Sequence, residues 1–222
     1  MKPVACPHVP ARGQTDHCKR CCYSRAVDSD HELLARWGND ESAAGSELFA
    51  RYFRGLFRFF ATKVDDEVDD LVQSTLLDCV KYRERLRAAD NFKAYLYAIA
   101  RRRLYRHLSA TRSKAVDFGV SSIMDLGGSP SSIVARHAEE QNLVRSLRTL
   151  PVELQVLLEL HYWEEMTVDD AAKVLELPLG TAKSRLRRAR RMLREKLGID
   201  PDAPDDAFDR SVAAARVGAA ES

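Results

Sequence analysis

The chain has 222 residues, enough for one large domain or two small ones. Hydrophobic residues make up 45% and charged residues 31%, while Gly (10) and Pro (8) are scarce, so the composition excludes an all-β or mostly irregular protein and favours packed helices. The formal net charge is only +2, which excludes a polycation that coats DNA along its whole length.

Residues 1–27 are polar, contain proline and show no helical period. They hold no signal-peptide core, and no apolar run in the chain reaches the roughly 18–20 residues of a membrane span, so we expect a cytoplasmic protein without membrane insertion. Four of the five cysteines lie within the first 22 residues, which in a reducing compartment suggests metal or redox chemistry. The candidate tetrahedral zinc ligands are Cys6, His8, Cys18 and Cys21, although a redox switch and an inert tail remain open.

Residues 28–112 have the pattern of a first small helical domain. Ser29 followed by Glu32 predicts a capping box, and residues 39–45 interrupt the helix that it opens. Apolar residues at helical spacing predict further helices over 46–63, 68–87 and 91–110.

Residues 113–135 lose this pattern and have the composition of a flexible linker. Helical periodicity returns over 136–197, where Pro151 suits the first turn of a helix and Thr167 caps another. Gly198 ends the last helix, and the acidic tail over 198–222 is expected to be disordered. We therefore predict an all-α protein of two small helical domains joined by a flexible linker.

Residues 167–196 predict a helix, a turn over 177–180 and a second helix rich in arginine. Such a helix-turn-helix inserts its second helix into the major groove of DNA. A solvated basic face on a structural helix is the alternative, but the capped preceding helix and the Pro-Gly turn favour DNA binding. The candidate residues that contact DNA are Thr181, Lys183, Ser184, Arg185, Arg187, Arg188 and Arg191.

The segment 91–107 interleaves aromatic rings with basic side chains. Rings can stack on exposed bases while guanidinium groups follow phosphates, so the mixture suits separated DNA strands. Four apolar residues of this segment are more readily explained as part of the hydrophobic core: the aromatic Phe92 and Tyr95 and the aliphatic Leu96 and Ile99. The candidate DNA-binding residues are Asn91, Lys93, Tyr97, Arg101, Arg102, Arg106 and His107.

Residues 65–78 join an acidic entry to an amphipathic helix. Acidic residues at the start of a helix interact favourably with the helix dipole, so one interpretation gives these acids a purely structural role. A docking face for a large partner is the other, and its candidate residues are Asp69, Asp70, Gln73, Leu76 and Leu77.

Taken together, these segments resemble the bacterial sigma-70 family, specifically its extracytoplasmic-function group. Residues 69–76 (DDLVQSTL) are similar to the family's helix that binds core RNA polymerase, and residues 92–104 (FKAYLYAIARRRL) to its minus-ten reading and melting helix. Residues 150–162, 167–172 and 179–190 (LGTAKSRLRRAR) resemble its minus-thirty-five domain.

The resemblance implies a sigma factor that binds core RNA polymerase and promoter DNA, works in the bacterial cytoplasm at the nucleoid, and is often restrained by an anti-sigma factor. It implies no catalytic residues and no required cofactor. The chain departs from the family at Ser74, at Asp169 with Asp170, and at Ala182, which affects promoter sequence and partner affinity rather than the assignment.

Two other classes of function compete with this interpretation. A conventional dimeric helix-turn-helix regulator would explain the C-terminal motif but leave residues 64–112 without a role. A zinc-dependent enzyme would need an open metal position and a general base, and no H-E-x-x-H motif occurs. We therefore expect a sigma factor, with its Cys/His-rich start as a candidate regulatory segment.

Overall fold

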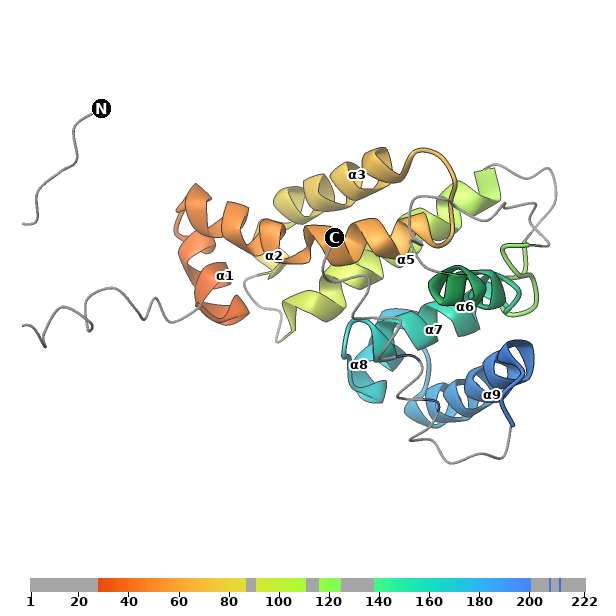
Figure 1. The fold of residues 1–222 in the computed structure, drawn as a ribbon. Coiled ribbons are helices and arrows are strands. Elements are labelled where there is room, and N and C mark those ends of the chain that lie inside the picture. Colours follow the sequence, from red (N-terminus) through yellow and green to blue (C-terminus); the bar gives the residue numbers. More distant parts are fainter. Residues whose placement is uncertain are drawn as a thin grey trace, which may run out of the picture.

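The structure is a computed structural model that describes residues 28–86, 91–110, 116–124 and 138–200, together with positions 208 and 212. Within these ranges the regular secondary structure is α-helical, apart from one isolated antiparallel bridge between Ser122 and Pro151. The predicted all-α class is confirmed. We call α1–α5 the first half and α6–α9 the second half (Figure 1).

Helices α1 (Asp30–Gly38) and α2 (Ser42–Ala61) pack tightly against each other. The predicted capping box is present, because Ser29 Oγ accepts from the Glu32 amide and the Glu32 carboxylate accepts from the Ser29 amide. Helix α2 begins four residues before the predicted start, however. Gly45 lies inside it as a contact residue, since an added Cβ would stand 2.6 Å from Cδ1 of Trp37.

The first half is completed by α3 (Val68–Lys81), the short α4 (Arg83–Leu86) and α5 (Phe92–Ala110). The single helix predicted over 68–87 is therefore two helices, because the chain leaves helical geometry at Tyr82 (φ −105°, ψ 23°). Helices α2, α3 and α5 bury a common set of large apolar side chains, which includes Leu56, Phe60, Val72, Leu96 and Leu104.

The second half consists of α6 (Ala138–Arg148), α7 (Val152–Tyr162), α8 (Val168–Leu175) and α9 (Leu179–Leu197). Thr167 caps α8 as predicted, and Gly198 ends α9 in the left-handed conformation (φ 70°). Helix α9 starts at Leu179, two residues earlier than predicted, and Pro151 precedes α7 as its N-cap instead of lying in its first turn.

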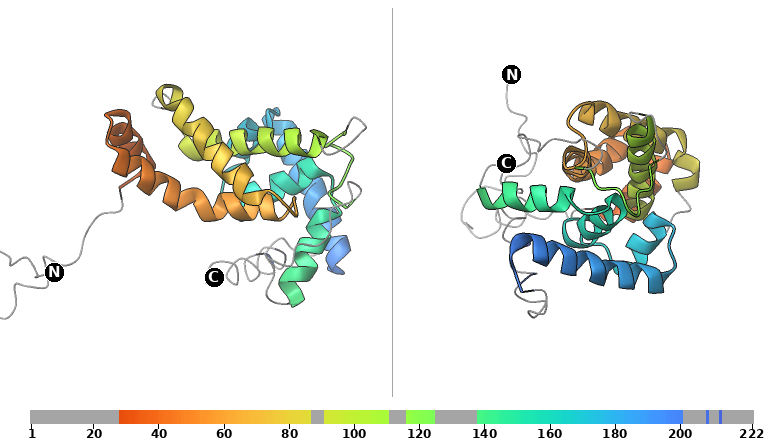
Figure 2. Two further views of the ribbon diagram at one scale, coloured as in Figure 1. Left: turned by 90° about the horizontal axis from the view of Figure 1, so that it is seen from above. Right: turned by 90° about the vertical axis from the view of Figure 1, so that its right-hand side faces the viewer.

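The two halves share one continuous core in this structure. Helix α8 packs on α5, and α9 lies on the side of α7 and α8 that faces away from the first half (Figures 1 and 2). The helix-turn-helix is thus attached to the first half through its supporting helices, and α9 stays at the periphery.

The described part of the predicted linker, residues 116–124, is held between these halves. Phe118 stacks on Tyr105 of α5 with 4.1 Å between ring centroids, and Ile123 is buried. The Glu153 amide donates to the Phe118 carbonyl at 3.0 Å, and the Val152 amide donates to Ser121 at 3.0 Å. This stretch is therefore packed chain, where the sequence predicted a flexible linker.

Two residues of the C-terminal tail also pack. Phe208 and Val212 are both buried, and the Phe208 ring lies edge-on to Tyr162 of α7 and under the guanidinium of Arg194 of α9. At these positions the tail joins the core of the second half, where the sequence predicted disorder.

Candidate nucleic-acid and polymerase interfaces

Helix α9 presents a basic face to solvent. Its inner face buries Leu186, Ala189 and Leu193, which recur at helical spacing. Five of the predicted DNA contacts are exposed on this helix: Lys183, Ser184, Arg187, Arg188 and Arg191. The structure shows no ion pair for these three arginines within the described residues. A free basic helix face of this kind fits the phosphates and base edges of a major groove.

The two other predicted contacts on α9 are only half exposed. Arg185 forms an ion pair with Glu153, so its guanidinium is fixed against the start of α7. Thr181 lies in the first turn of α9 and accepts from the hydroxyl of Ser184 through its carbonyl at 2.9 Å. Arg190, which was not among the predicted DNA contacts, faces inward, with its guanidinium 5.4 Å from the centroid of the Tyr162 ring.

Helix α3 presents the predicted docking face. Asp69, Asp70 and Gln73 are exposed, Leu77 is 58% exposed and Leu76 is half-buried. Val80 (49%) is also exposed on α3, and Phe53 (48%) is exposed on the adjacent helix α2. Several large exposed apolar side chains on neighbouring helices are typical of a protein interface.

The aromatic residues of α5 are mainly core. Phe92, Leu96 and Ile99 are buried, as their alternative reading predicted. Tyr97 is buried too: its ring centroid lies 5.6 Å from that of Phe59, and burial raises the pKa of its hydroxyl well above the ordinary value. Its proposed stacking on a base is not possible in this arrangement, because the ring faces the second half instead of solvent.

The polar candidates on α5 differ in their surroundings. Asn91 accepts from the Ala94 amide at 3.0 Å and so caps the helix. Arg106 is exposed, whereas His107 lies 3.3 Å from the carboxylate of Glu67. Among the residues predicted to bind the DNA strand, Arg106 therefore has a side chain that is exposed to solvent.

Three basic residues of α5 are bound by acids of the second half. Lys93 donates to the Glu164 carbonyl and lies 3.6 Å from its carboxylate. Arg102 and Arg101 both pair with Glu176, at 2.8 Å and 3.0 Å, and these guanidinium groups lower the pKa of the Glu176 carboxyl. The candidate strand-binding face is therefore occupied by carboxylates where phosphates would bind.

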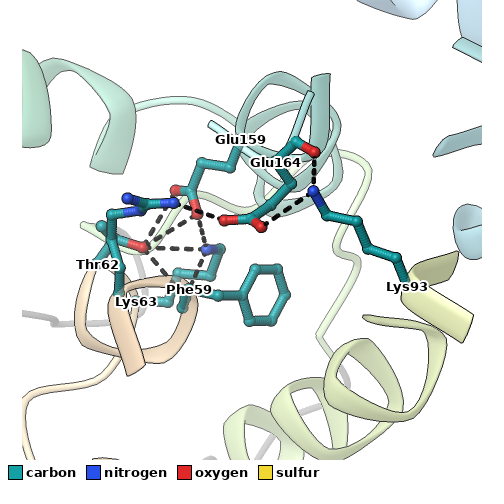
Figure 3. A network of polar contacts seen from close by, with 7 residues as sticks. Phe59, Thr62, Lys63, Lys93, Glu159 and Glu164 are labelled. Carbon is teal, nitrogen blue, oxygen red and sulfur yellow. Dashed lines mark hydrogen bonds and ion pairs between the residues drawn. The ribbon is translucent and has the colours of Figure 1, made fainter. Parts of the chain in front are cut away.

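A buried ion pair lies beside these contacts (Figure 3). The side chain of Lys63 at the end of α2 is fully buried and pairs with Glu159 of α7, which is 7% exposed. Lys63 Nζ also donates to the Phe59 carbonyl at 2.7 Å, and Thr62 Oγ1 donates to Glu159 at 3.1 Å. Burial lowers the pKa of Lys63, against the attraction of Glu159, which raises it.

Two further charged contacts join the halves. Arg148 at the end of α6 is fully buried; its Nε donates to the Thr62 carbonyl at 2.7 Å and its guanidinium lies 3.1 Å from Asp65. Arg58 pairs with Glu164 at 2.6 Å. We call the whole set the interdomain cluster: Arg58, Thr62, Lys63, Asp65, Lys93, Arg101, Arg102, Arg148, Glu159, Glu164 and Glu176. Sequence reasoning missed its acids, because their partners lie about seventy to a hundred positions away and leave no local pattern.

The candidate zinc ligands at Cys6, His8, Cys18 and Cys21 lie outside the described residues. Across the residues that are described, the structure gathers no group of three or more His, Cys, Asp or Glu suited to a metal ion. Cys79 is free and buried, and burial raises the pKa of its thiol to about 12. In that same part of the chain, no helix is both long and apolar enough to cross a bilayer.

Family models match both halves in the order that the sequence predicted. The model described as sigma-70 region 2 matches residues 48–114, and the model described as sigma-70, region 4, matches residues 140–193; together they cover more than half of the chain. The chain belongs to the sigma-70 family. In this sigma-70 chain, α5 lies within the region 2 match, and α8 with most of α9 lies within the region 4 match, as the resemblance implied.

Curated relatives agree. The chain is similar to the ECF RNA polymerase sigma-E factor of Haemophilus influenzae, with 24% identity over 182 residues that cover 76% of this chain and 95% of the relative. It is also similar to the RNA polymerase sigma-H factor of Pseudomonas aeruginosa, with 25% identity over 77% of this chain and 94% of the relative. These relatives support the extracytoplasmic-function group within the family.

Two solved structures share the fold. One is CnrH in complex with the cytosolic domain of CnrY (TM-score 0.57, 22% identity, 79% of this chain and 100% of that chain). The other is the sigma factor RpoE in complex with the anti-sigma factor NepR from Bartonella quintana (TM-score 0.52, 23% identity, 74% of this chain and 99% of that chain).

Proposed function

We propose that this sigma-70 chain is a promoter-specificity subunit of bacterial RNA polymerase, acting in the cytoplasm at the nucleoid as a binding protein and not as an enzyme. The observation that carries the proposal is the order of its surfaces: an exposed docking face on α3, a basic helix α5 and an exposed recognition helix α9 on one chain. The dimeric operator-binding alternative would leave the α3 face without a partner.

In this proposal α9 anchors the protein at the minus-thirty-five element. Lys183 and Ser184 lie near the start of the helix, where a major-groove helix reaches base edges, and Arg187, Arg188 and Arg191 follow along its exposed side. Arg185 is held by Glu153 at the start of α7, so it would contact the DNA by exchanging this carboxylate for a phosphate or a base edge. Leu186, Ala189 and Leu193 fix the helix to its support.

The first half binds core polymerase through α3 and the minus-ten strand through α5. Asp69, Asp70 and Gln73 supply polar contacts and Leu77 an apolar one on the exposed face of α3. Lys93, Arg101, Arg102 and Arg106 would follow the strand's phosphates. Tyr97 keeps a structural role in this proposal because it is buried.

Transcription in vitro tests the proposal. Core RNA polymerase is given a library of genomic promoter fragments, with and without the full chain. Discrete start sites that depend on the chain are expected. No chain-dependent transcript, together with dimeric binding of the chain alone to an operator, would overturn the proposal in favour of a conventional regulator. Asp70→Ala and Gln73→Ala should weaken polymerase binding without unfolding the chain, as circular dichroism would verify.

Two regulators are part of the proposal. An anti-sigma factor is one, supported by the likeness in fold to a sigma factor solved in complex with an anti-sigma factor. The other is the N-terminal Cys/His segment, whose donor types suit a zinc ion at Cys6, His8, Cys18 and Cys21. Metal analysis of the purified chain should give about one zinc, less after Cys18→Ser. Equal zinc in a chain lacking residues 1–27 would contradict the site.

A further inference from the structure

The outer face of α3 combines acidic residues with exposed apolar ones. Asp69, Gln73, Leu77 and Val80 recur at helical spacing, and all four are exposed. Leu77 is 58% exposed and Val80 49%. Exposed apolar side chains that gather on one face, with polar residues beside them, mark a surface that binds a partner. This face therefore suits a ligand that is basic and also carries apolar side chains.

Residues 1–27 have the complementary composition. They hold five Lys or Arg and one acid, with valines and a tyrosine among them. Residues 65–70, which lead into α3, hold five acids and no base. Opposite charges attract over about one Debye length, which is roughly 8–10 Å at physiological salt. The other end of the chain has the wrong sign for this face, because residues 198–222 hold six acids and two bases.

The basic segment joins the rest of the chain near this face. Arg36 pairs with Asp28, and the guanidinium of Arg51 donates to the Asp28 carbonyl at 2.7 Å, so α1 and α2 fix the point where the segment ends. Asp40, just after α1, pairs with Arg83, just after α3, at 2.8 Å. The end of α3 accordingly lies on the side of the first half that holds α1 (Figure 1).

The length of the segment is sufficient to cover the face. Helix α1 is about 14 Å long, so the end of α3 lies within roughly 40 Å of Asp28. A chain of 27 residues spans about 90 Å when extended and averages about 30 Å as a coil. The distance to the face is therefore close to the average reach of such a chain.

We propose that residues 1–27 fold back over the acidic and apolar face of α3 and compete there with core polymerase. The proposal rests on the proposed function, which assigns this face to polymerase. A tethered segment needs few contacts, because its attachment keeps it at an effective concentration in the millimolar range. Each exposed ion pair contributes little by itself. A partner that buries the whole face can therefore displace the segment, and a change in the segment alters how readily polymerase binds.

Photo-crosslinking in the full-length chain tests the contact. A benzophenone amino acid is placed at Val80 and, as the control, at Ser109, which is exposed at the end of α5. Val80 should crosslink to peptides from residues 1–27, and excess core polymerase should reduce the yield several-fold. The Ser109 probe should give no such crosslink. Absence of a crosslink from Val80 to the segment, or equal yields with and without polymerase, overturns the proposal.

Polymerase affinity separates this proposal from the proposed function. Lys19→Gln/Arg20→Gln removes two charges from the segment and keeps its cysteines; its matched control, Lys173→Gln/Lys196→Gln, removes two from exposed positions of the second half. The segment variant should bind core polymerase about three- to tenfold more tightly than the control, because apparent affinity scales with the fraction of chains whose face is uncovered. Equal affinities overturn the covering segment alone. Absence of polymerase binding by the native chain and by both variants overturns the proposed function itself.

Discussion

Helices α5 and α9 are both basic and nineteen residues long, yet their basic side chains differ in exposure and in partners. Lys183, Arg187, Arg188 and Arg191 of α9 point to solvent, whereas Lys93, Arg101 and Arg102 of α5 are held by carboxylates of the other half. The duplex-reading helix is ready to bind in the free protein, and the strand-reading helix is not. Charge alone therefore does not make a DNA-binding surface, because the same positive charge also attracts the acids of a neighbouring domain.

The largest expected effect comes from leaving one charge of the buried pair alone. Lys63→Ala should lower the free energy of unfolding by about 3–5 kcal/mol, since Glu159 would lose the cation that compensates its burial. Lys63→Met/Glu159→Leu should stay close to the native stability, because apolar side chains of similar volume replace both charges. Urea unfolding measures the two variants. A single variant as stable as the double variant would show that the burial of Glu159 does not depend on Lys63.

The second largest effect is expected from Phe208, which packs against α7 and α9. Phe208→Ala should lower the free energy of unfolding by about 3 kcal/mol, the loss typical of a buried phenylalanine. The reason is that the ring packs on Tyr162 and lies under the Arg194 guanidinium. Urea unfolding measures the change, with Asp200→Asn, at an exposed position near the end of α9, as the control. Equal stability of Phe208→Ala and the native chain would show that the tail is not part of the second half's core.

The exposed side of α9 gives a smaller effect. Arg188→Ala should weaken binding to duplex DNA of any sequence and reduce the slope of log affinity against log salt by about 0.9, because one phosphate contact is lost. Fluorescence anisotropy across a salt series measures it. Arg102→Ala is the matched control on α5: this arginine is already paired with Glu176, so duplex affinity should stay unchanged. Equal losses in both variants would remove the contrast between the two helices.

The sequence was sufficient for the helices and for the exposed side of α9, because both depend on local patterns. The capping box at Ser29, the cap at Thr167 and the stop at Gly198 were all predicted. Gly45 was misread as a break, because only the packed structure shows that Trp37 needs the space of its missing side chain. A glycine within a helical pattern can mark either a break in the helix or a close contact between two helices.

The interdomain cluster could not be predicted in the same way. Lys63 and Glu159 are 96 positions apart, and each looks like an ordinary surface charge in its own segment. The prediction that Tyr97 stacks on a base missed its burial for a related reason. Helix α5 is buried on two sides, one against α2 and α3 and one against the second half, so its apolar period does not reveal which rings reach solvent. Predicting these residues requires knowing how the halves meet, and that depends on tertiary contacts.

The smallest effect concerns pH and tests the covered face of α5 most directly. The pKa of Glu176 is lowered from 4.5 by Arg102 and Arg101, so the folded chain binds fewer protons here than the unfolded chain. Its contribution to stability is therefore fully present above about pH 4.5 and is lost as the pH falls through the lowered pKa. Because the carboxylate is largely exposed, solvent screens the contacts and the change in stability should be slight. Urea unfolding of the native chain and of Glu176→Gln from about pH 6 to about pH 3.5 measures it, and Glu176→Gln should flatten the part of the curve that Glu176 contributes. Identical curves for the two chains would mean that the two arginines are held by something other than this carboxylate.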